Sequence, residues 1–140
     1  MRYADTSVLV AALTNETETK RMQTWLAAQK SGNLAVSEWV ATEFSAALSI
    51  KLRTGQIEKA HRSDALAMFA QLLTGSFASL PISAMEFRAA AHFADRYTLG
   101  LRAGDALHLA VCANHGATLC TLDRRLNEAG TALGVKTMLL

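Results

Sequence analysis

Short apolar segments alternate along the chain with longer segments whose apolar residues recur at helical spacing. The clearest strand candidate is ATLCTL, which is short, apolar and bounded by Gly116 and Asp123. The pattern predicts strands over residues 2–5, 34–37, 77–83, 117–122 and 135–139. It predicts helices over residues 6–13, 16–29, 38–52, 57–73, 84–97, 105–115 and 123–130.

This alternation of strands and helices indicates the fold class. Parallel strands joined by helical crossovers give an α/β helix–sheet–helix sandwich. Proline occurs once and the eight glycines are scattered, so no linker or internal repeat divides the chain. In open parallel sheets, ligands bind at the carboxyl ends of the strands, so we expect the chemistry at that edge.

Composition excludes only a few classes of protein. The 140 residues are 51% hydrophobic and 19% charged, which is typical of a compact single domain. We find no signal peptide and no apolar run of membrane-spanning length, so we expect a soluble, cytoplasmic protein. The net charge of +2 is compatible with a nucleic-acid partner without requiring one. Cys112 and Cys120 lie in apolar segments, and we interpret them as buried thiols in a reducing compartment.

Glu43 is the acidic residue that a surface role explains least well. It lies about two turns into the predicted helix 38–52, too deep to cap that helix. Its neighbours three and four positions away are all apolar, namely Val40, Ala46, Trp39 and Ala47. A charged carboxylate in such surroundings is costly unless a cation meets it. The alternatives are a side chain that turns sideways to solvent or pairs with a distant arginine.

Three aspartates share a second pattern. Asp5 and Asp123 each follow a predicted strand, and Asp105 opens a helix after a glycine-containing turn. Each could simply cap its helix, which stabilises a protein by about 1 kcal/mol. Capping does not explain why two strands both end in an acid at the ligand-binding edge.

A shared acidic pocket would explain all four carboxylates. Several carboxylates within a few ångströms of one another need a counter-charge. Mg²⁺ or Mn²⁺ supplies one through oxygen ligands, and a bound metal can orient a phosphodiester and activate water. The sequence therefore predicts metal-assisted phosphodiester hydrolysis.

The four acidic segments also resemble a known family in their order. YADTSVLVAAL, ATEFSAAL, LRAGDALHLA and TLCTLDRRL look like a PIN domain, and together with the small size they resemble VapC-type ribonuclease toxins of toxin–antitoxin modules. The resemblance implies one PIN-like nuclease domain over residues 1–140, with a central parallel sheet of four to five strands flanked by helices on both faces. It implies that the catalytic, metal-binding residues are Asp5, Glu43, Asp105 and Asp123.

The resemblance carries further expectations about function. It implies Mg²⁺- or Mn²⁺-dependent endonucleolytic cleavage of RNA, a cognate antitoxin protein as partner, and a homodimer. Ser7 and Thr121 match small hydroxyl residues of the family and are candidates for holding metal-bound water or substrate phosphate. Arg102, Arg124 and Arg125 flank the acids and are candidates for contacting RNA phosphates, with solvated arginines as the alternative. His108 is expected to be structural, with a hydrogen bond to Asp105 as the other possibility.

Rival classes lack some of their required residues. A haloacid-dehalogenase-type enzyme needs a second acid two positions after the first, where this chain has Ser7. A phosphate-receiver domain needs adjacent acids after the first strand and a conspicuous lysine, and both are missing. The serious alternative is a catalytically silent PIN-like module that binds RNA or a partner. Cleavage of RNA with Mn²⁺ and with EDTA separates that module from the enzyme.

Overall fold

Five short parallel strands form the centre of the protein. The computed structural model describes all 140 residues. The strands are β1 (Arg2–Ala4), β2 (Leu34–Val36), β3 (Phe77–Ser79), β4 (Thr118–Thr121) and β5 (Thr137–Leu139). They lie in the order β3-β2-β1-β4-β5, and every neighbouring pair is parallel.

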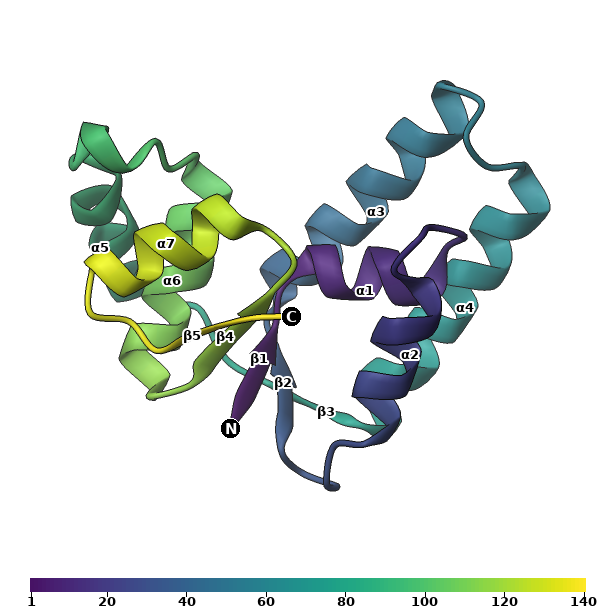
Figure 1. Ribbon diagram of the computed structural model, residues 1–140, viewed down its shortest axis with the longest axis horizontal. Coiled ribbons are helices and arrows are strands. Elements are labelled where there is room, and N and C mark those ends of the chain that lie inside the picture. Colours follow the sequence, from purple (N-terminus) through teal and green to yellow (C-terminus); the bar gives the residue numbers. More distant parts are fainter.

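Helices cover both faces of this sheet. They are α1 (Thr6–Leu13), α2 (Thr19–Ala27), α3 (Glu38–Arg53), α4 (Lys59–Gly75), α5 (Ala84–Ala94), α6 (Ala103–His115) and α7 (Arg124–Ala132), with a 3₁₀ turn η1 (Tyr97–Leu99) before α6. In Figure 1, α1–α4 lie on one side of the strands and α5–α7 on the other. The predicted fold class, a parallel sheet between two layers of helices, is confirmed.

The first helix is at the centre of the core. Its residues Val8 to Ala12 are all buried, and it packs against α2, α3 and α4. Such a helix needs apolar residues on every side, which explains the unbroken apolar run VLVAAL. Phe44 of α3 stacks on Phe69 of α4 at 4.3 Å between ring centroids and joins that helical pair. None of the helices combines the length and hydrophobicity needed to cross a lipid bilayer.

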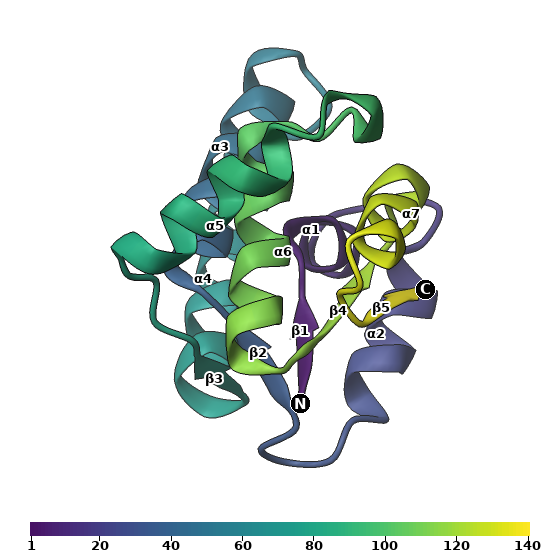
Figure 2. The same ribbon diagram turned by 90° about the vertical axis from the view of Figure 1, so that its left-hand side faces the viewer.

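The topology brings the ends of β1 and β4 together. These strands are neighbours, but β1 leads into α1 on one face and β4 leads into α7 on the other (Figures 1 and 2). Ala4 pairs with Cys120, and the Asp5 backbone N–H donates to the Cys120 carbonyl at 3.1 Å. Sheets of this class place ligands at such a switch point, beyond the carboxyl ends of the strands.

A buried acid fixes α5 to α6 on the far side. The Glu86 carboxylate accepts hydrogen bonds from the Ser83 hydroxyl at 2.6 Å, from the Ser83 backbone N–H at 2.7 Å and from the Asn114 side chain. The Ser83 hydrogen bonds lower the pKa of Glu86 to about 2. Glu86 therefore acts as a capping residue at the start of α5, as expected of an acid in the first turn.

Several predicted elements are longer than the observed ones. The strand predicted over 77–83 ends at Ser79, because Leu80 makes the last ladder-like bond to the Val36 carbonyl and Pro81 has no N–H to continue. The helix predicted over 16–29 begins only at Thr19. The Thr19 hydroxyl accepts from the Glu16 backbone N–H and donates to backbone oxygens of residues 11 and 14, so it holds the preceding turn.

Close packing of α7 predicts a sensitivity at Gly130. A Cβ there would lie 2.3 Å from Thr137 Cγ2 and 2.8 Å from Leu109 Cδ2, whereas a Cβ at Gly75 in α4 would meet open space. We expect Gly130→Ala to lower the free energy of unfolding by about 1–3 kcal/mol through overpacking. Gly75→Ala should be neutral or stabilising by less than about 1 kcal/mol. Urea denaturation of both variants measures the difference, and equal stabilities would contradict this packing.

Candidate functional site

Asp5 anchors the site at the end of β1. Its carboxylate accepts hydrogen bonds from the Ser7 hydroxyl at 2.5 Å, the Thr121 hydroxyl at 2.6 Å and the Val8 backbone N–H at 3.3 Å. Asp5 therefore caps α1, as one alternative predicted, and is also held by the neighbouring strand. Capping alone does not require the bond from Thr121.

Burial changes the pKa of the Asp5 carboxyl group. The side chain is only 4% exposed. Burial raises the pKa of Asp5, and the positive potential of His108 together with the hydrogen bonds from Ser7, Thr121 and Val8 opposes this shift only in part. An anion here is thus costly without a nearby cation.

Glu43 reaches the same region from α3. Its Oε2 atom accepts hydrogen bonds from the Thr6 hydroxyl at 2.5 Å and from His108 Nε2 at 2.6 Å. Burial alone would raise the pKa of Glu43, but the bond and charge of His108 and the bond from Thr6 outweigh it and lower that pKa. The partner of this acid is a histidine of α6 rather than the distant arginine considered from the sequence.

The second oxygen of Glu43 lies against the start of α6. A Cβ on Gly104 would be 2.6 Å from Glu43 Oε1 and 3.1 Å from Trp39 Nε1, so only glycine leaves room for them. Trp39 Nε1 is buried and makes no hydrogen bond. Thr6 and His108 both use Oε2 of Glu43, so Oε1 is left beside the Trp39 indole, which also helps to lower the pKa of Glu43.

Asp105 and Asp123 occupy helix starts at the same edge. Asp105, in the first turn of α6, accepts from the Arg102 backbone N–H at 3.2 Å. Asp123 caps α7 by accepting from the backbone N–H groups of Arg125 and Leu126 at 2.8 and 3.2 Å. Both aspartates line one small pocket together with Arg102 and Arg125.

The four predicted acids are linked but do not form a closed cluster. Asp123 connects to Asp5 through Thr121, whose hydroxyl accepts from the Asp123 backbone N–H at 2.9 Å and donates to Asp5. Glu43 contacts the surroundings of Gly104, the neighbour of Asp105. No group of three or more His, Cys, Asp or Glu side chains is placed to hold a metal ion together.

The donor chemistry nevertheless suits a hard divalent cation. All four candidates offer carboxylate oxygens, the ligands that Mg²⁺ and Mn²⁺ prefer. Only Glu43 forms an ion pair with a basic side chain, whereas Asp5, Asp105 and Asp123 form none. Uncompensated negative charge beside a buried carboxylate is the setting that a cation would stabilise.

The predicted substrate-contacting residues lie in different places. The Ser7 hydroxyl accepts from the Leu122 backbone N–H at 3.0 Å while donating to Asp5, so Ser7 and Thr121 both support that carboxylate. Arg102 lines the pocket with Asp105 and Asp123. Arg124 is exposed and is not among the residues of that pocket, whereas its neighbour Arg125 is.

Three residues that the sequence did not assign to the site support it. Thr6 and His108 hold Glu43, and Tyr3 holds His108 from the other side of its ring at 2.9 Å. The hydrogen bond from His108 to Asp105 that the sequence allowed is not formed. The sequence held one signal for the role of His108, since this histidine lies one turn after an acid on an otherwise apolar helix.

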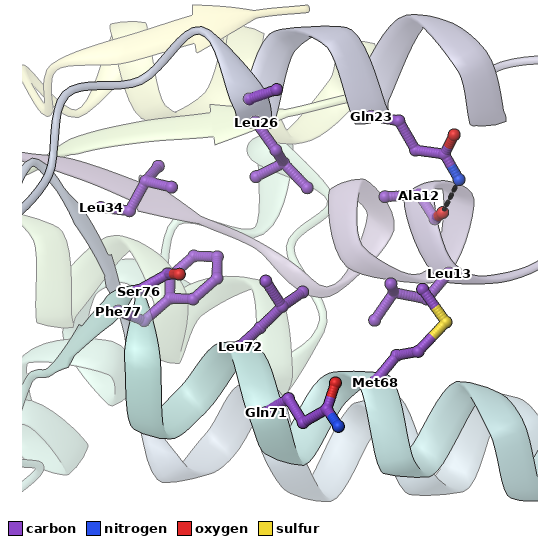
Figure 3. A pocket seen from close by; sticks show the side chains of 11 residues that line it. Ala12, Leu13, Gln23, Leu26, Leu34, Met68, Gln71, Leu72, Ser76 and Phe77 are labelled. Atoms are coloured by element: carbon purple, nitrogen blue, oxygen red, sulfur yellow. Dashed lines mark hydrogen bonds between the residues drawn. The ribbon is translucent and has the colours of Figure 1, made fainter.

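A separate apolar groove of about 540 Å³ lies away from these acids. Figure 3 shows its walls, formed by α1, α2, α4 and the segment entering β3. The Gln23 side chain donates to the Ala12 carbonyl across one end of the groove at 2.9 Å. The lining residues are Ala12, Leu13, Gln23, Leu26, Ala27, Leu34, Met68, Gln71, Leu72, Ser76 and Phe77. None of the four candidate acids contributes to it.

Comparison with known proteins identifies the family. The model of the PIN domain matches residues 2–131, so the chain belongs to the PIN domain family. A search of curated proteins gives no significant match.

Solved structures with the same fold include one described as a toxin. The structure of FitAcB from Neisseria gonorrhoeae aligns at 16% identity with a TM-score of 0.69, over 99% of this chain and 96% of that one. VapBC2 from Rickettsia felis, bound to a promoter DNA fragment, aligns at 17% identity with a TM-score of 0.67, over 100% and 99%. VapC20 from Mycobacterium tuberculosis, described as a Sarcin-Ricin loop cleaving toxin, aligns at 17% identity with a TM-score of 0.71, over 96% of both chains.

The raised pKa of Asp5 predicts that its charge destabilises the metal-free protein. Because folding raises this pKa, ionisation of Asp5 costs the folded state increasingly as pH rises through the folded-state pKa. In EDTA at pH 7, Asp5→Asn should therefore unfold at an equal or higher temperature than the wild type. The difference should shrink as pH falls to about 3, below the ordinary aspartate pKa of about 3.9, because Asp5 is then mostly protonated in both states.

Thermal unfolding followed by circular dichroism measures this effect. Asp95→Asn, at the exposed end of α5, is the matched control. A large loss of stability in Asp5→Asn at pH 7 would show that the hydrogen bonds to the anion outweigh the cost of burying it.

Proposed function

We propose that this PIN domain is a Mg²⁺- or Mn²⁺-dependent endoribonuclease that acts as the toxin of a toxin–antitoxin pair. The observation that carries the proposal is the pair of aspartates, Asp5 and Asp123, at the ends of adjacent strands β1 and β4. They lie at the switch point of the sheet, and Thr121 joins them. Glu43 and Asp105 approach the same edge from α3 and α6.

Asp5, Glu43 and Asp105 would hold the metal, directly or through water, and Asp123 would shape the site or help hold a second ion. A divalent cation bound there supplies Lewis acidity toward a phosphodiester and lowers the pKa of water. The protein's own residues orient the acids: Ser7 and Thr121 fix Asp5, and Thr6 and His108 fix Glu43. Such fixed orientation reduces the reorganisation needed at reaction.

The basic residues at this edge support an anionic substrate. Arg102 and Arg125 line the pocket of Asp105 and Asp123 without pairing with either acid, so their charge remains available to phosphate. Arg125 also donates to the Gly100 carbonyl at 3.4 Å. On this basis, Arg102 and Arg125 are stronger candidates for RNA contact than Arg124.

The related structures support the proposed partners. VapBC2 was solved bound to a DNA fragment from its promoter, and VapC20 is described as a Sarcin-Ricin loop cleaving toxin. By analogy we propose a cognate antitoxin and a homodimer for this protein. Size-exclusion chromatography with light scattering tests the dimer directly.

RNA cleavage tests the central proposal. We expect purified protein to cut RNA with Mn²⁺ and to be inactive in EDTA. Asp5→Asn, Glu43→Gln, Asp105→Asn and Asp123→Asn should each reduce the rate by about 100-fold or more, since a metal contributes several kcal/mol to the transition state. The exposed Asp95→Asn is the control and should cut at the wild-type rate.

Binding separates the enzyme from the silent module. Loss of cleavage with retained RNA affinity in the four variants supports the nuclease. RNA binding without cleavage, unchanged by Mn²⁺, EDTA or the substitutions, would instead identify a binding module.

Gly104 provides an independent test of the geometry around Glu43. In Gly104→Ala the new methyl group would displace Glu43 Oε1, while alanine suits the helix itself. We expect a folded protein whose cleavage rate falls by about 100-fold, the size of effect that a misplacement of about 1 Å can have. Gly75→Ala is the matched control for added helical alanine. Wild-type cleavage by Gly104→Ala would exclude a role for this orientation of Glu43.

A further inference from the structure

A chain of buried hydrogen bonds ends on Glu43. Ser37 Oγ lies 2.7 Å from Tyr3 Oη, Tyr3 Oη lies 2.9 Å from His108 Nδ1, and His108 Nε2 lies 2.6 Å from Glu43 Oε2. Tyr3 is 0%, Ser37 1% and His108 3% exposed, so water does not compete for these bonds. The chain connects β1, the start of α3 and α6, three elements distant in sequence.

The carboxylate fixes the direction of the hydrogen bond at the Glu43 end of the chain. Nε2 of His108 carries a hydrogen in either protonation state, because its partner is a carboxylate that only accepts. In the neutral ring, Nδ1 then accepts from the Tyr3 hydroxyl, which accepts in turn from Ser37. In the charged ring, Nδ1 donates to the Tyr3 hydroxyl, which then donates to Ser37. Every buried polar group in the chain thereby has a partner.

The chain selects one oxygen of Glu43. His108 and Thr6 both donate to Oε2. Oε1 lies over Gly104 beside the Trp39 indole and receives no hydrogen bond from His108 or Thr6. Gly104 and His108 are four residues apart and so lie on one face of α6, the first leaving room for Glu43 and the second holding it.

We propose that His108, supported by Tyr3, is a positioning residue that holds Glu43 with Oε1 free for a divalent cation. The inference rests on the proposed metal-dependent function and adds a residue to it. Removing a residue that hydrogen-bonds to a metal ligand and orients it commonly weakens metal affinity by about 10–100-fold. A purely structural His108 would affect folding but not the affinity of the folded protein for metal.

Metal affinity measured without RNA tests this role. We compare the wild type, His108→Leu, His108→Gln and Tyr3→Phe by calorimetric titration with Mn²⁺, after circular dichroism has established that each is folded. His108→Leu, which keeps bulk but has no donor, should bind Mn²⁺ about 10–100-fold more weakly. His108→Gln should recover most of the affinity, because its amide N–H can reach Glu43. Tyr3→Phe should show a smaller loss.

Controls distinguish the two levels of the proposal. His92→Gln, at an exposed histidine of α5, should bind Mn²⁺ like the wild type. Wild-type affinity in folded His108→Leu overturns the positioning role alone and leaves the proposed nuclease standing. If His108→Leu does not fold, the other two variants decide the question. Unchanged Mn²⁺ affinity in Tyr3→Phe overturns the positioning role, and so does a loss of Mn²⁺ affinity in His108→Gln as large as that expected for His108→Leu. Failure of the wild type to bind Mn²⁺ overturns the metal-dependent function as well.

Discussion

The pairing of β1 with β4 is the constraint that organises this protein, and the hydrogen bond between Thr121 and Asp5 depends on it. It can form only because β1 and β4 are adjacent and in register, with Ala4 opposite Cys120. The same adjacency sends α1 and α7 to opposite faces of the sheet (Figure 1). Burying Asp5 there is unfavourable for its charged form, so the packing of the core around α1 has to offset that cost.

Local pattern was sufficient for the architecture. The apolar run of α1 and the short apolar strands appear at their predicted places, and α1 has the predicted bounds. The ends of helices and strands were less predictable, because they depend on the hydrogen bonds of individual side chains to residues elsewhere in the chain. Thr19 delays α2 by holding a turn across to residue 11, and no periodicity of hydrophobic residues contains that information.

The sequence pattern singled out candidate acids but not the contacts that these acids make. Glu43 was singled out because its helical neighbours are apolar, and the structure explains this by burial against α6. Its partners Thr6 and His108 are 37 and 65 residues away, so no local spacing indicates them. Ser7 and Thr121 were expected near metal or phosphate, and the structure shows that both hydroxyls bond to Asp5 and to backbone N–H groups.

The segment from Gly104 to His108 shows how one helix turn can serve three purposes. Asp105 accepts a backbone hydrogen bond at the start of α6, so it stabilises the helix whatever else it does. Glycine at position 104 lowers the helix propensity of α6, and His108 places a polar ring in a buried position. Neither residue is the choice that would make α6 most stable. Both departures act on the same carboxylate, Glu43, which indicates that its orientation rather than the stability of α6 determines these residues.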